Sequence, residues 1–166
     1  MSTRTDTSGS TSTNTTTSIS TSTIARTASL QRVITFYEAL DSAAVARIGT
    51  VYGDDATFKD PFNEVRGIAA IARIFEHMFV QVDAPRFVVL DAIEQGGNAF
   101  LTWEFRFRMK RFDTATTQVI RGATHLRFAA DGRVAMHRDY WDAAEELYEK
   151  LPVLGSLMRW LRRQAG

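Results

Sequence analysis

The feature that most constrains this chain is residues 98–110, where apolar and polar side chains alternate. The apolar positions are Ala99, Leu101, Trp103, Phe105, Phe107 and Met109. A period of two is that of a β-strand with one buried face. Similar runs over 86–94, 116–128 and 133–141 are separated by short sequences typical of turns. We therefore expect four long strands that form an antiparallel meander.

Helical periodicity marks the chain before this meander. In residues 29–41 and again in 68–84, apolar side chains recur at spacings of three and four, which predicts two amphipathic helices. Asp41 or Ser42 caps a shorter helix that is expected to end near Tyr52. Helices followed by a sheet indicate an α+β fold. We expect a cone-shaped, curved antiparallel sheet wrapped around the N-terminal helices, with a pocket inside the cone.

The two ends of the chain differ from this domain. Between residues 2 and 23, 17 of 22 residues are Ser or Thr, and such a segment buries too little apolar surface to fold. We expect a disordered arm over residues 1–27 and a domain over 28–145. Residues 146–166 form a predicted C-terminal extension with an amphipathic helix that carries three arginines. This helix either docks on the domain or a dimer mate, or makes peripheral contact with a membrane surface or a partner.

Composition and motifs exclude several classes of function. A formal net charge of +1 gives no electrostatic case for nucleic acid binding. The chain has no cysteine and three histidines at unrelated positions, which predicts no metal site. It has no phosphate-binding or dinucleotide-binding glycine motif, so no cofactor is expected. No segment reads as a secretory signal or a transmembrane span, and a cytoplasmic location is the expectation.

The first candidate for chemistry is Asp60, which directly precedes Pro61. Proline favours an extended conformation of the residue before it, so the Asp60 carboxylate has a defined direction. Phe58 and Phe62 flank it and supply a poorly hydrated wall, which suits a general base. The alternative interpretation is that Asp60 caps a turn through an Asx-type hydrogen bond.

A second candidate site lies on the last predicted strand. Alternation places His137, Asp139 and Trp141 on one face of this strand and Met136, Arg138 and Tyr140 on the other. A histidine and an aspartate two residues apart divide acid and base roles when their environments differ. The alternative is that they hydrogen-bond each other and only satisfy a polar cavity. His77 and His125 are not predicted as ligands.

Residues 29–142 resemble the nuclear transport factor 2-like superfamily, in particular its SnoaL-like and ketosteroid isomerase-like members. The order of elements and the motif ATFKDP at 56–61 carry the resemblance. It implies the cone fold and a homodimer through the sheet. It also implies that the face with His137, Asp139 and Trp141 is the pocket side, and that Asp60 is in the position of the isomerases' general base. The family's helix tyrosine aligns with Phe36, one position before Tyr37, and its protonated aspartate aligns with Thr124. Because the oxyanion donors are not reproduced, steroid isomerisation is not expected.

These observations lead to three hypotheses. The first is a cofactor-independent isomerase, cyclase or dehydratase for a small hydrophobic carbonyl compound, with Asp60 as base and His137 and Asp139 as acid or orienting groups. The second is a carrier or binding protein for a small hydrophobic molecule. The third is an interaction module that uses the C-terminal helix. The residues predicted to contact the ligand are Phe36, Tyr37, Phe58, Phe62, Phe75, Trp103, Thr124 and Trp141.

Overall fold

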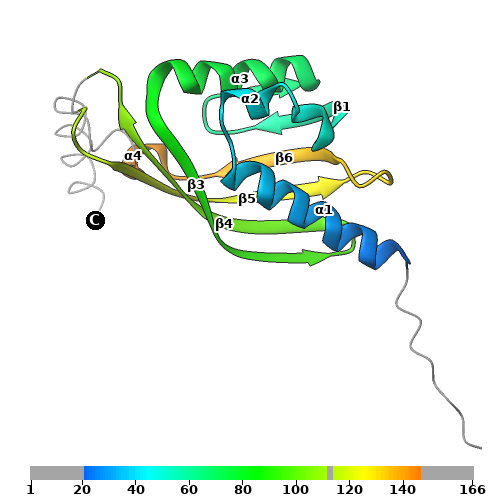
Figure 1. The fold of residues 1–166 in the computed structure, drawn as a ribbon. Coiled ribbons are helices and arrows are strands. Elements are labelled where there is room, and N and C mark those ends of the chain that lie inside the picture. The colour runs from blue at the N-terminus through cyan, green and yellow to red at the C-terminus, as the bar shows by residue number, and fades with distance from the viewer. Residues whose placement is uncertain (1–20, 112–113, 147–166) are drawn as a thin grey trace, which may run out of the picture.

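The computed structural model of the chain describes residues 21–111 and 114–146 (Figure 1). Six strands form one sheet in the order β2-β1-β6-β5-β4-β3. The strands are β1 (Tyr52–Lys59), β2 (Glu64–Arg66), β3 (Val82–Gln95), β4 (Asn98–Met109), β5 (Gln118–Phe128) and β6 (Val134–Tyr140). The helices are α1 (Thr21–Glu38), α2 (Ser42–Val45), the 3-10 turn η1 (Ile48–Thr50), α3 (Ile68–Gln81) and α4 (Ala143–Glu146).

The predicted meander is confirmed, since β3, β4, β5 and β6 pair in sequence order and antiparallel. The inward side chains of β4 are buried, as the alternation requires. One core cluster joins side chains of both long helices to the sheet, so α1 and α3 pack on the same face. Its members from the helices include Leu30, Val33, Ile71 and Phe75. The fold is the predicted α+β arrangement, in which the helices pack on one face of a single sheet.

The sheet also contains a pairing that the alternation does not reveal. Strand β1 lies parallel to β6, which brings Phe58 beside His137, and it pairs antiparallel with the short β2. Strand β1 includes Asp54 and Asp55, so it lacks the regular alternation of apolar and polar side chains seen in β4. Both aspartates are exposed, and Asp54 forms an ion pair with Arg133 while Asp55 forms one with Arg66. The parallel pairing places β1 next to the last strand and so positions the candidate site.

The helical segments differ from the prediction at their ends. Helix α1 begins at Thr21, earlier than the predicted start at residue 29. Asp41 caps α2 as expected, since its Oδ1 accepts from the Ala44 N–H at 2.6 Å. The predicted single helix to Tyr52 is instead one α-turn and a 3-10 turn, and Tyr52 begins β1. Tyr52 is fully buried, so a residue expected at a helix end lies in the core.

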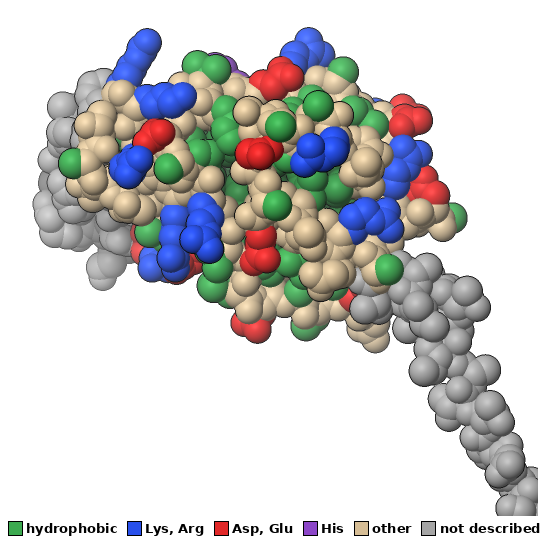
Figure 2. Space-filling view, viewed as in Figure 1, with side chains coloured by type: hydrophobic (Ala, Val, Ile, Leu, Met, Phe, Trp, Pro, Cys, Tyr) green, Lys and Arg blue, Asp and Glu red, His purple; other side chains and the backbone are tan. Residues whose placement is uncertain are grey.

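The surface in Figure 2 mixes basic and acidic side chains rather than collecting one sign. Ion pairs on the sheet, such as Arg106 with Glu104 and Arg108 with Asp83, account for part of this pattern. No helix in the described ranges is long and apolar enough to cross a membrane. Apart from Glu146, the predicted C-terminal extension lies outside the described residues, as does the arm before residue 21.

Candidate active site

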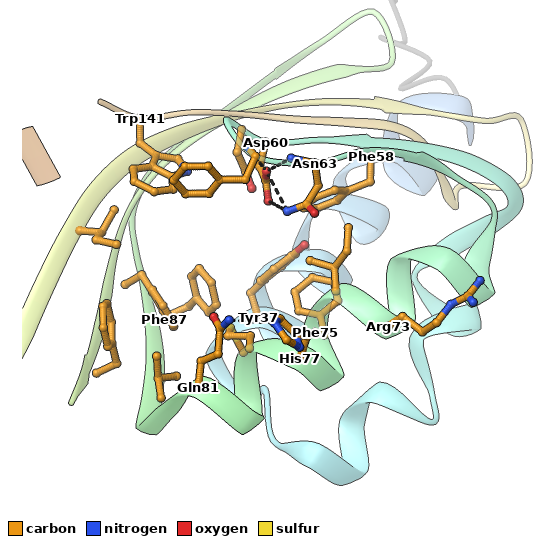
Figure 3. Close-up of a pocket in the computed structure, with 18 of the residues that line it drawn as sticks. Tyr37, Phe58, Asp60, Asn63, Arg73, Phe75, His77, Gln81, Phe87 and Trp141 are labelled. Atoms are coloured by element: carbon orange, nitrogen blue, oxygen red, sulfur yellow. Dashed lines mark hydrogen bonds between the residues drawn. The ribbon is translucent and has the colours of Figure 1, made fainter. Parts of the chain in front are cut away.

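A cavity of about 620 Å³ opens between the inner face of the sheet and α3 (Figure 3). This volume lies in the range of small-molecule sites. Its apolar lining includes Phe58, Phe62, Val65, Ala70, Ile74, Phe75, Met78, Val82, Phe87, Trp103, Phe105, Phe107, Met109, Ile120 and Trp141. Its polar lining is Tyr37, Asp60, Asn63, Arg73, His77, Gln81 and Asp139. The cavity is therefore mostly apolar, with a few convergent polar groups.

One wall of the cavity consists of aromatic rings from the strands. Phe87 stacks on Phe105 with ring centroids 4.5 Å apart, and Phe105 stacks on Phe107 at 4.9 Å. Trp103 meets Phe87 edge to face at 5.8 Å. These side chains are the inward positions of the alternating strand β4 together with one from β3. The alternation that builds the sheet thus also builds the apolar wall.

A hydrogen-bonded cluster lies beside the cavity and reaches its lining through Tyr37 and Asp139. His137 is 2% exposed, and its ring stacks on Phe58 at 4.6 Å. Its Nε2 lies 2.8 Å from Asp139 Oδ1, and its Nδ1 lies 2.8 Å from the Tyr52 hydroxyl. The Tyr37 hydroxyl bonds to that of Tyr52 and lies 3.3 Å from the same Nδ1. Residues from α1, β1 and β6 therefore meet around one imidazole.

The direction of these hydrogen bonds follows from the protonation of the two tyrosines and from the Asp139 carboxylate. Burial raises the pKa of the Tyr52 hydroxyl, so this group stays protonated and has a hydrogen to donate. Burial, followed by the influence of Tyr52 and Asp139, raises the pKa of Tyr37 well above its ordinary value. The Asp139 carboxylate only accepts, so His137 Nε2 donates to it. In a neutral His137, Nδ1 then accepts from the Tyr52 hydroxyl, whose oxygen accepts from Tyr37.

A second chain of hydrogen bonds reaches Asp139 from the other side. The Trp103 indole N–H donates to Thr124 Oγ1 at 2.8 Å, and the Thr124 hydroxyl donates to Asp139 Oδ1. Asp139 Oδ1 thus accepts from both Thr124 and His137. Its Oδ2 accepts no hydrogen bond from any residue that the structure describes, while Asp139 itself lines the cavity. The free oxygen is the one available to a ligand.

The other candidate carboxylate, Asp60, has different surroundings. Its Oδ1 accepts from the backbone N–H groups of Phe62 at 2.7 Å and Asn63 at 2.6 Å. Both of its oxygens also accept from the Asn63 side-chain amide, at 3.1 and 2.9 Å, as the dashed lines in Figure 3 show. This is the Asx-type turn given above as the alternative. Asp60 lines the cavity, but its carboxylate also holds the turn between β1 and β2.

Most of the predicted ligand residues line this cavity. They are Tyr37, Phe58, Phe62, Phe75, Trp103 and Trp141. Thr124 lines a much smaller space that it shares with His137 and Asp139. Phe36 is among neither set and packs edge to face on Tyr37 at 5.7 Å. Tyr37, the next residue on α1, is the helix tyrosine whose hydroxyl reaches Tyr52 and His137.

Sequence reasoning missed five polar residues of the site: Tyr52, Asn63, Arg73, His77 and Gln81. His77 lines the cavity and bonds to Gln81 at 2.8 Å, whereas it was set aside because it lies next to the apolar face of its helix. The spacing of four residues between them was the available signal. Tyr52 had no comparable signal, because its partners are 15 and 85 residues away. Its role depends on the parallel pairing of β1 and β6.

Comparison with protein families gives one match, in which residues 33–137 fit the model of the SnoaL-like domain. A search of curated protein sequences gave no significant match. Within the described residues, no group of three or more His, Asp or Glu side chains is arranged to hold a metal ion.

Several solved structures share this fold at low sequence identity. A protein assigned as a SnoaL-like polyketide cyclase from Jannaschia sp. CCS1 has a TM-score of 0.63 and 15% identity, with 74% of this chain and 88% of that chain covered. An epoxide hydrolase of the LEH-like type from M. tuberculosis has a TM-score of 0.60 and 18% identity, covering 73% and 87%. A ketosteroid isomerase-like protein from Catenulispora acidiphila, in complex with trimethylamine, has a TM-score of 0.61 and 16% identity, covering 72% and 88%.

Proposed function

The chain belongs to the family of SnoaL-like domains, and from this premise we propose that it is a cofactor-independent acid–base enzyme for a small hydrophobic carbonyl compound. The observation that carries the proposal is the free Oδ2 of Asp139, which lines a mostly apolar cavity. A carboxylate with one oxygen fixed by two donors and the other directed at a ligand is arranged for proton transfer. The reaction is of the isomerase, cyclase or dehydratase type.

Asp139 is the proposed base. Its Oδ2 takes a proton from the carbon next to the substrate carbonyl, the C–H electron pair passes into an enolate, and Asp139 becomes a carboxylic acid. The same proton is then returned at another atom, or assists a leaving hydroxide, according to the substrate. His137 is buried and does not line the main cavity, so its proposed role is to orient Asp139 through the 2.8 Å hydrogen bond.

Asp60 is the second candidate for the base. Its position on the cavity lining keeps it within the proposal, and the resemblance to the isomerases favours it. Its hydrogen bonds to Phe62 and Asn63 favour Asp139 instead, because three donors already occupy the Asp60 oxygens. The apolar lining and the small ligand held by a structural neighbour, trimethylamine, support a small molecule as the occupant.

The test uses 2-tetralone, an apolar ketone with activated protons next to its carbonyl. Exchange of these protons in D₂O is followed by ¹H NMR, and binding is followed by the fluorescence of the tryptophans on the cavity wall. We expect the wild type to accelerate exchange and Asp139→Asn to lose at least 100-fold of that acceleration, since positioned bases contribute about 10² to 10⁴-fold. Binding without any accelerated exchange would reject the enzyme.

The carrier hypothesis is the alternative, and one observation favours it. Every hydrogen of the hydrogen-bonded cluster is already used, from Tyr37 to Tyr52 to His137 and from Trp103 to Thr124. Among the described residues of this cluster, no hydrogen is left to stabilise an enolate unless a bond is exchanged. A carrier would bind 2-tetralone equally well in the wild type and in Asp139→Asn, with no exchange in either.

We further propose that the protein forms a homodimer through the outer face of its sheet. Ile93 and Phe100 are paired neighbours on β3 and β4, and both are exposed, at 69% and 48%. Tyr140 on β6 is 47% exposed. Large apolar side chains gathered on one sheet face are typical of an interface. Sedimentation equilibrium should give twice the chain mass, and Phe100→Glu should give the monomer.

A further inference from the structure

Gly122 lies directly against the indole ring of Trp103. Gly122 on β5 pairs with Trp103 on β4. A Cβ atom built on Gly122 would lie 2.5 Å from the Cζ2 and Cη2 atoms of the Trp103 indole, which is too close for any side chain. The backbone at Gly122 does not have a positive φ, so no local conformation requires glycine. The missing side chain instead makes room for the indole against β5.

The position of this indole fixes the next hydrogen bond. The indole N–H donates and cannot accept, so the oxygen of Thr124 is the acceptor in the 2.8 Å contact with Trp103. The single hydroxyl hydrogen of Thr124 is then directed at Asp139 Oδ1, its neighbour across β5 and β6. Trp103 and Thr124 are both buried, so water does not compete for these bonds.

Asp139 receives this hydrogen bond on the same oxygen that faces His137. Two donors on Oδ1, from Thr124 and from His137 Nε2, hold the carboxylate plane in one orientation. The other oxygen, Oδ2, remains for the cavity. If the Thr124 hydroxyl rotated away, Oδ1 would keep only the bond to His137, and the carboxylate would be free to turn about its Cβ–Cγ bond.

We propose that Gly122 and Trp103 are positioning residues that act through Thr124 to select the oxygen that Asp139 presents to the ligand. The effect of these hydrogen bonds on catalysis rests on the proposed function, in which Asp139 is the base. Trp103 also forms part of the aromatic wall of the cavity, so one side chain shapes the ligand site and orients its reactive group. A displacement of about 1 Å at a catalytic group costs on the order of 100-fold in rate.

The experiment compares variants of Gly122, Trp103 and Thr124 by two measurements. The first is the NMR resonance of the Asp139 side-chain carbon together with that of the Trp103 indole N–H, recorded without ligand. The second is the exchange rate of 2-tetralone. We expect Gly122→Ala, Trp103→Phe and Thr124→Val each to shift the Asp139 resonance and to lower the exchange rate by about 10 to 100-fold.

Two variants serve as controls. Thr124→Ser keeps the hydroxyl and is the conservative rescue, so it should recover most of the resonance position and of the rate that Thr124→Val loses. Gly53→Ala is the matched glycine control, because Gly53 is also in a strand and a Cβ there would lie at an ordinary 3.5 Å from the Val134 carbonyl oxygen. It should change neither measurement. If Gly122→Ala does not fold, Trp103→Phe and Thr124→Val still carry the test.

An Asp139 resonance that stays unchanged in Gly122→Ala and Thr124→Val would overturn the inference, even if the rate falls. An unchanged rate in variants whose resonance has moved would also overturn it, provided that Asp139→Asn abolishes exchange. A wild type that does not exchange 2-tetralone would reject the proposed function instead. In that case the Asp139 resonance alone decides whether Gly122 and Trp103 position the carboxylate.

Discussion

The two carboxylates of the cavity differ in where their hydrogen-bond partners come from. Asp60 takes all of its described partners from its own turn, within three residues along the chain. Asp139 takes its partners from another strand and from a histidine that is itself held by Tyr52, 85 residues before it. Asp60 is therefore fixed by local structure, whereas Asp139 is fixed by the assembled fold.

This difference bears on chemistry as well as on folding. The Asp60 oxygens accept from three donors that also define the turn, so a proton or ligand at Asp60 competes with the backbone. The donors on Asp139 converge on Oδ1 and leave Oδ2 uncommitted in the described structure. A catalytic carboxylate needs a held oxygen and a free one. The following predictions test whether the two residues really divide structure and chemistry in this way.

The largest expected effect separates the two residues by activity. Asp139→Asn should reduce the exchange of 2-tetralone at least 100-fold, which corresponds to about 2.7 kcal/mol of barrier. Asp60→Asn should stay within about threefold of the wild type, since asparagine keeps an acceptor oxygen for the Asx turn. The rates are measured by ¹H NMR at equal protein concentration. The reverse order of the two variants would make Asp60 the base.

The next effect concerns the residue that holds the network together. Tyr52→Phe removes the hydroxyl between Tyr37 and His137 and leaves both without this partner in a buried place. We expect a loss of about 2 kcal/mol in the free energy of unfolding, measured with urea. Tyr140→Phe is the matched control, because it removes a hydroxyl from the outer face of the sheet and keeps the apolar ring proposed for the dimer interface. It should change this free energy by less than about 0.5 kcal/mol. Equal losses would mean that the network does not stabilise the fold.

The features that can be predicted from the sequence are those that depend on residues close together in the sequence. The period of two in residues 98–110 predicts β4, and the Asp-Pro turn predicts the Asx geometry at Asp60, because each depends on neighbours along the chain. Alternation also predicts that His137 and Asp139 share one face of β6, and the two side chains are in fact hydrogen-bonded. In each case the residues that form the sequence pattern are also the residues whose contacts determine the local structure.

The other features depend on contacts between residues far apart in the sequence, and these contacts could not be predicted from the sequence. Nothing near Tyr52 reveals that β1 pairs in parallel with β6, so its contact with His137 was not foreseen. The partners of Thr124 are likewise set by the register of β4, β5 and β6. The choice between Phe36 and Tyr37 depended on a rotation of about 100° about the axis of α1, which only packing decides. Function depends more on these contacts than on the local ones.

The pH dependence of stability offers a further way to sharpen the comparison. Burial raises the pKa of Tyr52 in the folded protein, so its contribution is complete below the ordinary tyrosine pKa of about 10 and is lost as the pH rises above it. One such group lowers the unfolding free energy by about 1.4 kcal/mol per pH unit in this range. Urea unfolding at pH 9, 10 and 11 measures the slope. Tyr52→Phe should reduce the slope by this amount, and an unchanged slope would show that Tyr52 ionises freely in the folded state.

The smallest expected effect returns to Asp60 and tests its local role by itself. Asp60→Ala removes the acceptor for the N–H groups of Phe62 and Asn63, which then turn to water at the mouth of the cavity. Because these groups are partly exposed, the loss in unfolding free energy should be only about 1 kcal/mol. Asp60→Asn should lose less than half of this, because its amide oxygen still accepts from the turn. If both variants lose the same amount, the charge of Asp60 rather than its hydrogen-bond geometry stabilises the turn. The division between a local structural carboxylate and a catalytic one formed by the fold would then need a different physical basis.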